Sequence, residues 1–179
     1  MRVFWKRGYE GASLLELTRA MGINRPSLYA AFGNKEALFR KAVERYVERN
    51  GAPLREALVQ PSARAVVEHL LRSTASRAGS GSIRGCLLVQ GALACGDSAE
   101  PVRRELAARR ADVEASLRER FERAVSERDL PGDANPAALA KYVATFQNGL
   151  AVQLASGATR EELLGAVELA LRAWPDMGR

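Results

Sequence analysis

The sequence has few side chains that could bind a metal or form a disulfide framework. Among 179 residues there are one histidine, His69, and two cysteines, Cys86 and Cys95. The separation of these cysteines matches neither a CxxC redox pair nor a zinc finger. We therefore expect no cofactor, no structural zinc site and, in a reduced compartment, no disulfide framework.

The sequence also lacks long apolar runs and the common catalytic motifs. No segment approaches the roughly 20 consecutive apolar residues that span a bilayer, so we expect no membrane association. Charge follows the first apolar residues too closely for a secretory signal peptide, and we expect a cytoplasmic protein. We find no glycine-rich phosphate loop, no carboxylate pair in an apolar setting and no metal-binding set, so we predict that the chain is not an enzyme.

The composition is that of a globular protein with a positive charge excess near its N-terminus. Hydrophobic residues make up 47% of the chain and charged residues 27%, which is sufficient for a substantial core. The formal net charge is +6, and residues 1–50 hold ten Lys or Arg but five Asp or Glu. Such a local excess is typical of proteins that bind polyanions, although a solvated basic face produces it as well.

Apolar residues recur at helical spacing throughout, and no alternating β-branched run predicts a strand. We therefore expect an all-α fold. The break at residues 50–53 divides it into a first domain at residues 1–50 and a second at residues 51–179. Caps, prolines and glycines predict helices at residues 1–7, 13–21, 24–33, 35–49 and 54–58, from residue 61, and at residues 86–95, 101–127, 136–157 and 159–174.

The segment from Ser13 to Lys35 has the spacing of a helix-turn-helix motif. Ser13 and Glu16 form a predicted capping box, Gly22 ends that helix, and Asn24 caps the next one. In this motif the N-terminal half of the second helix enters the major groove of DNA. We therefore predict an N-terminal three-helix helix-turn-helix DNA-binding domain.

Two groups of side chains in this segment are candidates for DNA contact. Ser13, Tyr29 and Lys35 suit phosphate oxygens, because they offer a hydroxyl beside a helix N-terminus, a phenol and an ammonium group. The first turns of the second helix carry the polar residues suited to base edges. These are Asn24, Arg25, Ser27 and Tyr29. Solvated residues on a surface helix would explain the same pattern without DNA, and an exposed lysine needs no special explanation.

The run from residue 4 to residue 39 resembles the DNA-binding domain of TetR-type repressors. The resemblance is carried by Gly-Tyr-Glu at residues 8–10, Leu-Tyr-x-x-Phe at residues 28–32 and Lys-x-x-Leu at residues 35–38. It implies that Ser13 and Lys35 bind phosphates. It also implies that the groove-facing side of the recognition helix carries Arg25, Pro26, Ser27, Tyr29 and Ala30.

The resemblance has further implications for the rest of the chain. It implies a C-terminal helical bundle for ligand binding and dimerisation, in which the last two helices, at about residues 136–174, pair in a homodimer. In that family the first helix normally begins earlier and follows a basic arm, whereas here Met1 already lies within it. The first helix is therefore interpreted as truncated, through a clipped helix or a misassigned start.

Several residues of the second domain are candidates for an effector pocket or a sensor. They are His69, Cys86, Gln90, Tyr142 and Phe146. Each also has a purely structural explanation. A lone histidine is more often satisfied in the core, and a cysteine on an apolar helix is usually a small buried hydrophobe. Aromatic residues at helical spacing fit a core or a dimer interface as well as a pocket.

Together these patterns predict a homodimeric repressor that binds a palindromic DNA operator and is released by an unidentified small-molecule effector. A ligand would act by stabilising a conformation with weaker affinity for DNA. The alternative is a helical adaptor that binds a protein partner and never touches DNA. The adaptor would share the amphipathic helices and the basic patch, but it does not predict the polar cluster on the second helix of the motif.

Overall fold

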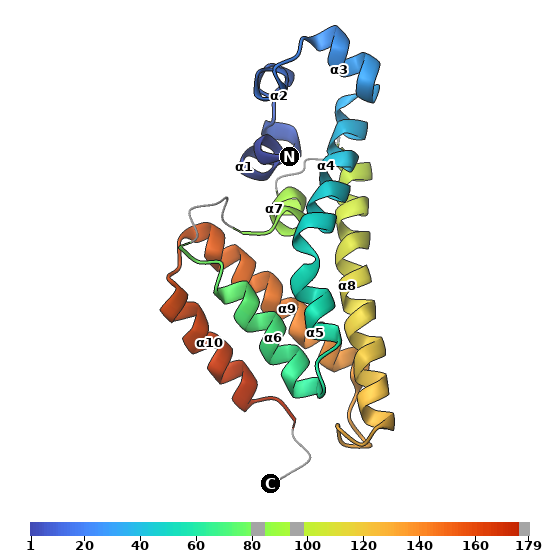
Figure 1. Ribbon diagram of the computed structural model, residues 1–179, viewed down its shortest axis with the longest axis vertical. Coiled ribbons are helices and arrows are strands. Elements are labelled where there is room, and N and C mark those ends of the chain that lie inside the picture. Colours follow the sequence, from blue (N-terminus) through green and yellow to red (C-terminus); the bar gives the residue numbers. More distant parts are fainter. Residues whose placement is uncertain (80–84, 94–98, 176–179) are drawn as a thin grey trace. The chain divides into compact units, whose positions relative to one another are not determined.

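The computed structural model describes residues 1–79, 85–93 and 99–175, and the regular elements in these ranges are α-helices (Figure 1). The predicted all-α fold is confirmed. None of the described helices is both long and apolar enough to cross a membrane. The helices are α1 (Arg2–Gly11), α2 (Leu14–Met21), α3 (Arg25–Phe32), α4 (Lys35–Asn50), α5 (Ala52–Leu58), α6 (Ala63–Ala75), α7 (Leu87–Leu93), α8 (Glu100–Ser126), α9 (Pro136–Ser156) and α10 (Arg160–Arg172).

Most of these helices begin where a side-chain oxygen can accept a hydrogen bond from an unpaired backbone N–H group. Such caps satisfy donors that have no partner within the first helical turn. The predicted capping box of α2 is present, and a second box begins α10. The N-cap residues are Ser13 for α2, Asn24 for α3, Asn34 for α4, Ser62 for α6, Asn135 for α9 and Thr159 for α10.

Two details differ from the sequence-based expectations. The helix expected to stop at Gly8 instead kinks there, because Gly8 adopts φ 70° and ψ −177° before the chain resumes helical geometry to Gly11. The helix expected to open at Pro61 begins two residues later, since Ser62 provides the cap. The predicted helix around residues 86–95 is described as far as Leu93, and Cys95 and the glycine-serine segment at residues 80–82 lie outside the described residues.

The chain divides into two compact units. The first comprises residues 1–51 and 86–109, and the second comprises residues 52–85 and 110–179. The break expected near residue 50 coincides with the first division between them. Residues 86–109 belong to the first unit, whereas we expected a continuous second domain from residue 51 onward.

Aromatic side chains form the centre of the first unit. The rings of Phe4 in α1 and Phe39 in α4 meet edge to face with centroids 5.0 Å apart, and both side chains are fully buried. Tyr9 packs on Phe39 at 5.2 Å, and Trp5 meets Tyr46 at 4.9 Å. Edge-to-face contacts of this kind add to the stabilisation from apolar burial. They join α1 to α4.

The second unit is built around α6, which packs against α5, α9 and α10. Its core includes Phe121 and Trp174, whose ring centroids are 5.2 Å apart. Two polar contacts fix the N-terminal end of α6 and the preceding loop: Asp129 Oδ2 accepts from the Ala63 N–H, and Arg120 Nη2 donates to the Gln60 carbonyl at 3.0 Å. The loop between α5 and α6 is thus tied to the end of α8.

The caps predict a specific stability change. Ser62→Ala removes the hydroxyl that accepts from the Ala65 N–H at 3.2 Å, and we expect the free energy of unfolding to fall by about 1 kcal/mol. Urea unfolding followed by circular dichroism measures the change. Ser126→Ala is the control, because the Ser126 hydroxyl only donates to the Arg123 carbonyl near the end of α8. Equal stability of Ser62→Ala and the wild type would contradict the prediction.

Candidate nucleic-acid interface

The helices α2 and α3 are joined by a short turn whose geometry depends on glycine. Gly22 adopts the left-handed conformation, φ 67° and ψ 30°, and its N–H donates to the Arg19 carbonyl. The next N–H, of Ile23, donates to the Thr18 carbonyl at 3.1 Å. These bonds satisfy carbonyls at the end of α2 as in a Schellman motif. The turn lets Leu28 of α3 and Leu17 of α2 both be buried, which confirms the predicted helix-turn-helix.

The predicted base-contacting residues lie together on α3. Leu28 is fully buried, whereas the Tyr29 side chain is 46% exposed. The side-chain oxygen of Asn24 accepts from the Ser27 N–H at 2.8 Å, so it fixes the first turn of the helix. The exposed residues of the helix and its cap are Asn24, Arg25, Pro26, Ser27, Tyr29, Ala30 and Ala31.

Ser13 is exposed, and its hydroxyl belongs to the cap of α2. The Ser13 Oγ accepts from the Glu16 N–H and donates to the Glu16 carboxylate, both at 3.1 Å. Hydrogen bonds from Ser13 hold the pKa of Glu16 below its usual range, and Arg7 lies 3.4 Å from the same side chain. The hydroxyl proton of Ser13 is thus directed at a carboxylate in this structure.

Lys35, at the start of α4, lies against the end of α1. Its Nζ donates to the Glu10 carbonyl at 3.3 Å and sits 4.7 Å from the centroid of the Tyr9 ring. A cation over an aromatic face is attracted by the ring quadrupole. Partial burial lowers the pKa of Lys35, and the charge of Glu10 opposes this shift. Tyr9 and Glu10 therefore position this ammonium group, a role that their place in the sequence did not indicate.

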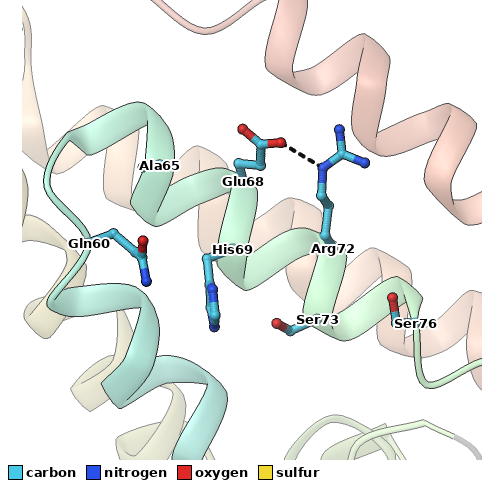
Figure 2. A pocket seen from close by; sticks show the side chains of 7 residues that line it. All are labelled: Gln60, Ala65, Glu68, His69, Arg72, Ser73 and Ser76. Carbon is cyan, nitrogen blue, oxygen red and sulfur yellow. Dashed lines mark hydrogen bonds and ion pairs between the residues drawn. The ribbon is translucent and has the colours of Figure 1, made fainter.

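The candidate effector residue His69 lines a pocket of ≈ 460 Å³ in the second unit (Figure 2). Its Nε2 atom is shielded from solvent and makes no hydrogen bond, although Glu56 Oε2 lies 3.4 Å away. This environment differs from that of a core histidine with hydrogen-bonded ring nitrogens, which was the structural alternative for His69. On the pocket wall Glu68 is paired with Arg72, which also contacts Glu168. The remaining lining residues are Gln60, Ala65, Ser73 and Ser76.

The candidate sensor Cys86 lies in the first unit, directly before α7. Its sulfur accepts a hydrogen bond from the Tyr46 hydroxyl at 3.3 Å, and the thiol is partly exposed. Gln90 follows one turn later, and its N–H donates to the Cys86 carbonyl at 2.9 Å. The second candidate thiol, Cys95, lies outside the described residues.

The remaining candidates, Tyr142 and Phe146, lie on α9 in the second unit. Their ring centroids are 6.3 Å apart; Tyr142 is 38% exposed, and Phe146 packs partly against the core. Of the five candidate effector residues, only His69 lines the pocket of Figure 2. Within the part of the chain that the structure describes, no three His, Cys, Asp or Glu side chains form a group that could hold a metal.

Two family models match the chain. Residues 1–42 match "Bacterial regulatory proteins, tetR family", and residues 61–161 match "Tetracyclin repressor-like, C-terminal domain". Among curated proteins, the HTH-type transcriptional repressor ComR of Escherichia coli is 28% identical over 99% of this chain and 86% of its own length. The repressor BdcR of the same organism is 35% identical over 50% of this chain and 46% of its own length.

Solved structures show the same similarity over nearly the whole chain. A cysteine mutant of the TetR family regulator CifR, complexed with a 26-base-pair double-stranded operator, is 47% identical and superposes with a TM-score of 0.93. The match covers 97% of this chain and 92% of that one. A TetR regulator from Rhodococcus sp. RHA1 is 41% identical, with a TM-score of 0.67, over 98% of this chain and 95% of its own.

The left-handed conformation of Gly22 predicts how a methyl group added at this position changes the stability of the protein. Gly22→Ala places a Cβ where no atom lies within 4 Å, so only the left-handed backbone opposes it. We expect a loss of about 1–2 kcal/mol in the free energy of unfolding, measured by urea titration. Gly132→Ala is the control, because Gly132 has equally open space without a positive φ, and we expect it to be neutral or slightly stabilising. Equal effects of the two substitutions would contradict this account.

Proposed function

The chain belongs to the TetR family of bacterial regulatory proteins, and from this premise we propose that it is a homodimeric repressor released from its operator by a small molecule. Its relatives are transcriptional regulators rather than enzymes. The observation that carries the proposal is the exposed surface of α3, where Arg25, Ser27 and Tyr29 project from a capped helix of a helix-turn-helix. A repressor acts where the chromosome lies, and we therefore propose a cytoplasmic location.

We assign two kinds of DNA contact to the first unit. Residues on the first turns of α3 would meet base edges in the major groove, while Lys35 and Tyr29 would bind phosphate oxygens. The attachment of Lys35 to the end of α1 supports this role, because a positioned ammonium loses less side-chain entropy on binding. Ser13 would contribute to phosphate binding by turning its hydroxyl away from Glu16.

A dimer through α9 and α10 is supported by side chains that remain exposed in the single chain. Tyr142, Val152 and Leu169 are large, apolar and 38%, 38% and 65% exposed. Gly149 and Gly165 lie within these helices, a Cβ added to either would meet no atom within 4 Å, and neither has a positive φ. Glycine in a helix costs about 1 kcal/mol relative to alanine, and close approach of a second copy would explain its presence.

The dimer would place two recognition helices in successive major grooves about 34–36 Å apart. An effector bound in the second unit would favour a different separation and so weaken DNA binding. A hundredfold release needs a coupling free energy of only about 2.7 kcal/mol. The His69 pocket supports an effector site in the second unit.

Selection of duplexes from a random library with the full-length protein tests the function, and Lys35→Ala sharpens the test. We expect a palindromic site to be enriched. Against that site, Lys35→Ala should weaken binding and reduce the salt slope by about 0.9 for each phosphate that the lysine neutralises in the wild type, since released counterions set that slope. Fluorescence anisotropy at several salt concentrations measures both. Arg55→Ala on α5 is the control for loss of one positive charge. Absence of any enriched duplex would refute the function.

The exposed apolar surface of α9 and α10, which we propose as the dimer interface, yields a separate prediction. Leu169→Glu places a charge on the exposed apolar surface of α10, and burial of an unpaired charge in an interface is strongly unfavourable. We expect the protein to become monomeric in light scattering after size-exclusion chromatography. Val59→Glu is the matched control, because Val59 is 79% exposed but lies between α5 and α6. A dimer that persists in Leu169→Glu would place the interface elsewhere.

A further inference from the structure

The surface of α3 restricts which bases this helix can read, an inference that rests on the proposed DNA-binding function. In the major groove, Arg or Lys pairs with guanine, Asn or Gln with adenine, and Asp or Glu with cytosine. The thymine methyl group is instead met by small apolar side chains. The side chains that a recognition helix presents therefore indicate the composition of its half-site.

The helix carries one side chain suited to bidentate base contact. Between Arg25 and Phe32, Arg25 is the only charged residue, and Asn, Gln, Lys, Asp and Glu are absent. Asn24 precedes the helix, but its side-chain oxygen accepts from the Ser27 N–H at 2.8 Å. A bidentate contact with adenine needs that same oxygen. The bidentate contact that remains is the one between Arg25 and guanine.

The middle of the exposed face is apolar and small. Leu28 is fully buried, and Ala30 lies two residues further, about 200° around the helix, so its methyl group points away from the core. Pro26 lies one turn before Ala30 on the same side, and both residues are exposed. Neither side chain can donate or accept a hydrogen bond. The side of α3 opposite the buried Leu28 therefore presents the apolar side chains of Pro26 and Ala30.

We propose that each operator half-site contains a G·C pair read by Arg25 and, within about three base pairs, a thymine whose methyl group contacts Ala30 and Pro26. The spacing follows from the helix: Arg25 and Ala30 are separated by about 7.5 Å along its axis, or roughly two base steps of 3.4 Å. Adenine enters the half-site through its pairing with thymine, without a contact of its own.

The test begins with duplexes selected from a random library by the full-length protein. The wild type should enrich half-sites in which guanine and thymine occur within about three base pairs. Arg25→Ala should lose the enrichment of guanine. Replacement of the enriched thymine by deoxyuridine removes only its methyl group, and we expect the Kd to rise about fourfold for each half-site changed.

A double-mutant cycle tests the part that Ala30 plays in that methyl contact. Ala30→Gly removes one of the two side chains that meet the thymine methyl group and leaves Pro26, so the deoxyuridine penalty should fall from about fourfold to about twofold in this variant. Ala31→Gly is the matched control, because it costs the same helix propensity but lies about 100° away around α3. It should retain the fourfold penalty. Thermal unfolding of both variants verifies that they are equally folded.

The outcomes separate this inference from the function on which it rests. Enrichment of a palindrome without guanine, or a site whose thymines can be replaced by deoxyuridine without loss of affinity, would overturn the inference and leave the repressor function intact. Equal penalties in Ala30→Gly and Ala31→Gly would overturn the role of Ala30. If no duplex is enriched, both the function and the inference fail.

Discussion

The arrangement of the first unit depends on the edge-to-face contact between Phe4 and Phe39. These rings join α1, which precedes the helix-turn-helix, to α4, which follows it. The contact therefore fixes the two ends of the chain segment between α1 and α4, and this segment contains α2 and α3. Tyr9 extends the same cluster, packing on Phe39 while its ring lies beneath the Lys35 ammonium. This aromatic cluster thus joins the helices on either side of the helix-turn-helix and includes the ring beneath the neighbouring cation.

Local features of this fold could be predicted from the sequence because their causes lie within a few residues. A cap joins a side chain to an N–H group three positions away, so Ser13, Asn24 and Asn34 predicted the starts of their helices. Gly22 predicted the turn for the same reason. The kink at Gly8 was not predicted, because a glycine that permits a left-handed residue can end a helix or merely interrupt it.

Contacts between distant segments could not be predicted in the same way. The hydrogen bond from Tyr46 to Cys86 joins residues 40 positions apart, and helical periodicity contains no information about such a pairing. The candidate site shows the same division. The exposed residues of α3 follow from the cap and the burial of Leu28, whereas the attachment of Lys35 to Tyr9 depends on tertiary packing. His69 was a candidate for an effector pocket on its chemistry alone, whereas the residues that line the pocket beside it come together through tertiary packing.

The return of residues 86–109 to the first unit has a consequence for building hybrid regulators. The sequence suggests residue 51 as the point at which to exchange N-terminal segments between homologues, but that exchange would separate α1 and α4 from the α7 surface that they contact. The transplanted fragment would then expose apolar side chains to water or meet a foreign α7 with a different shape. Exchange of the first unit in this architecture therefore requires two chain segments, residues 1–51 and 86–109, to be moved together through three crossover points rather than one.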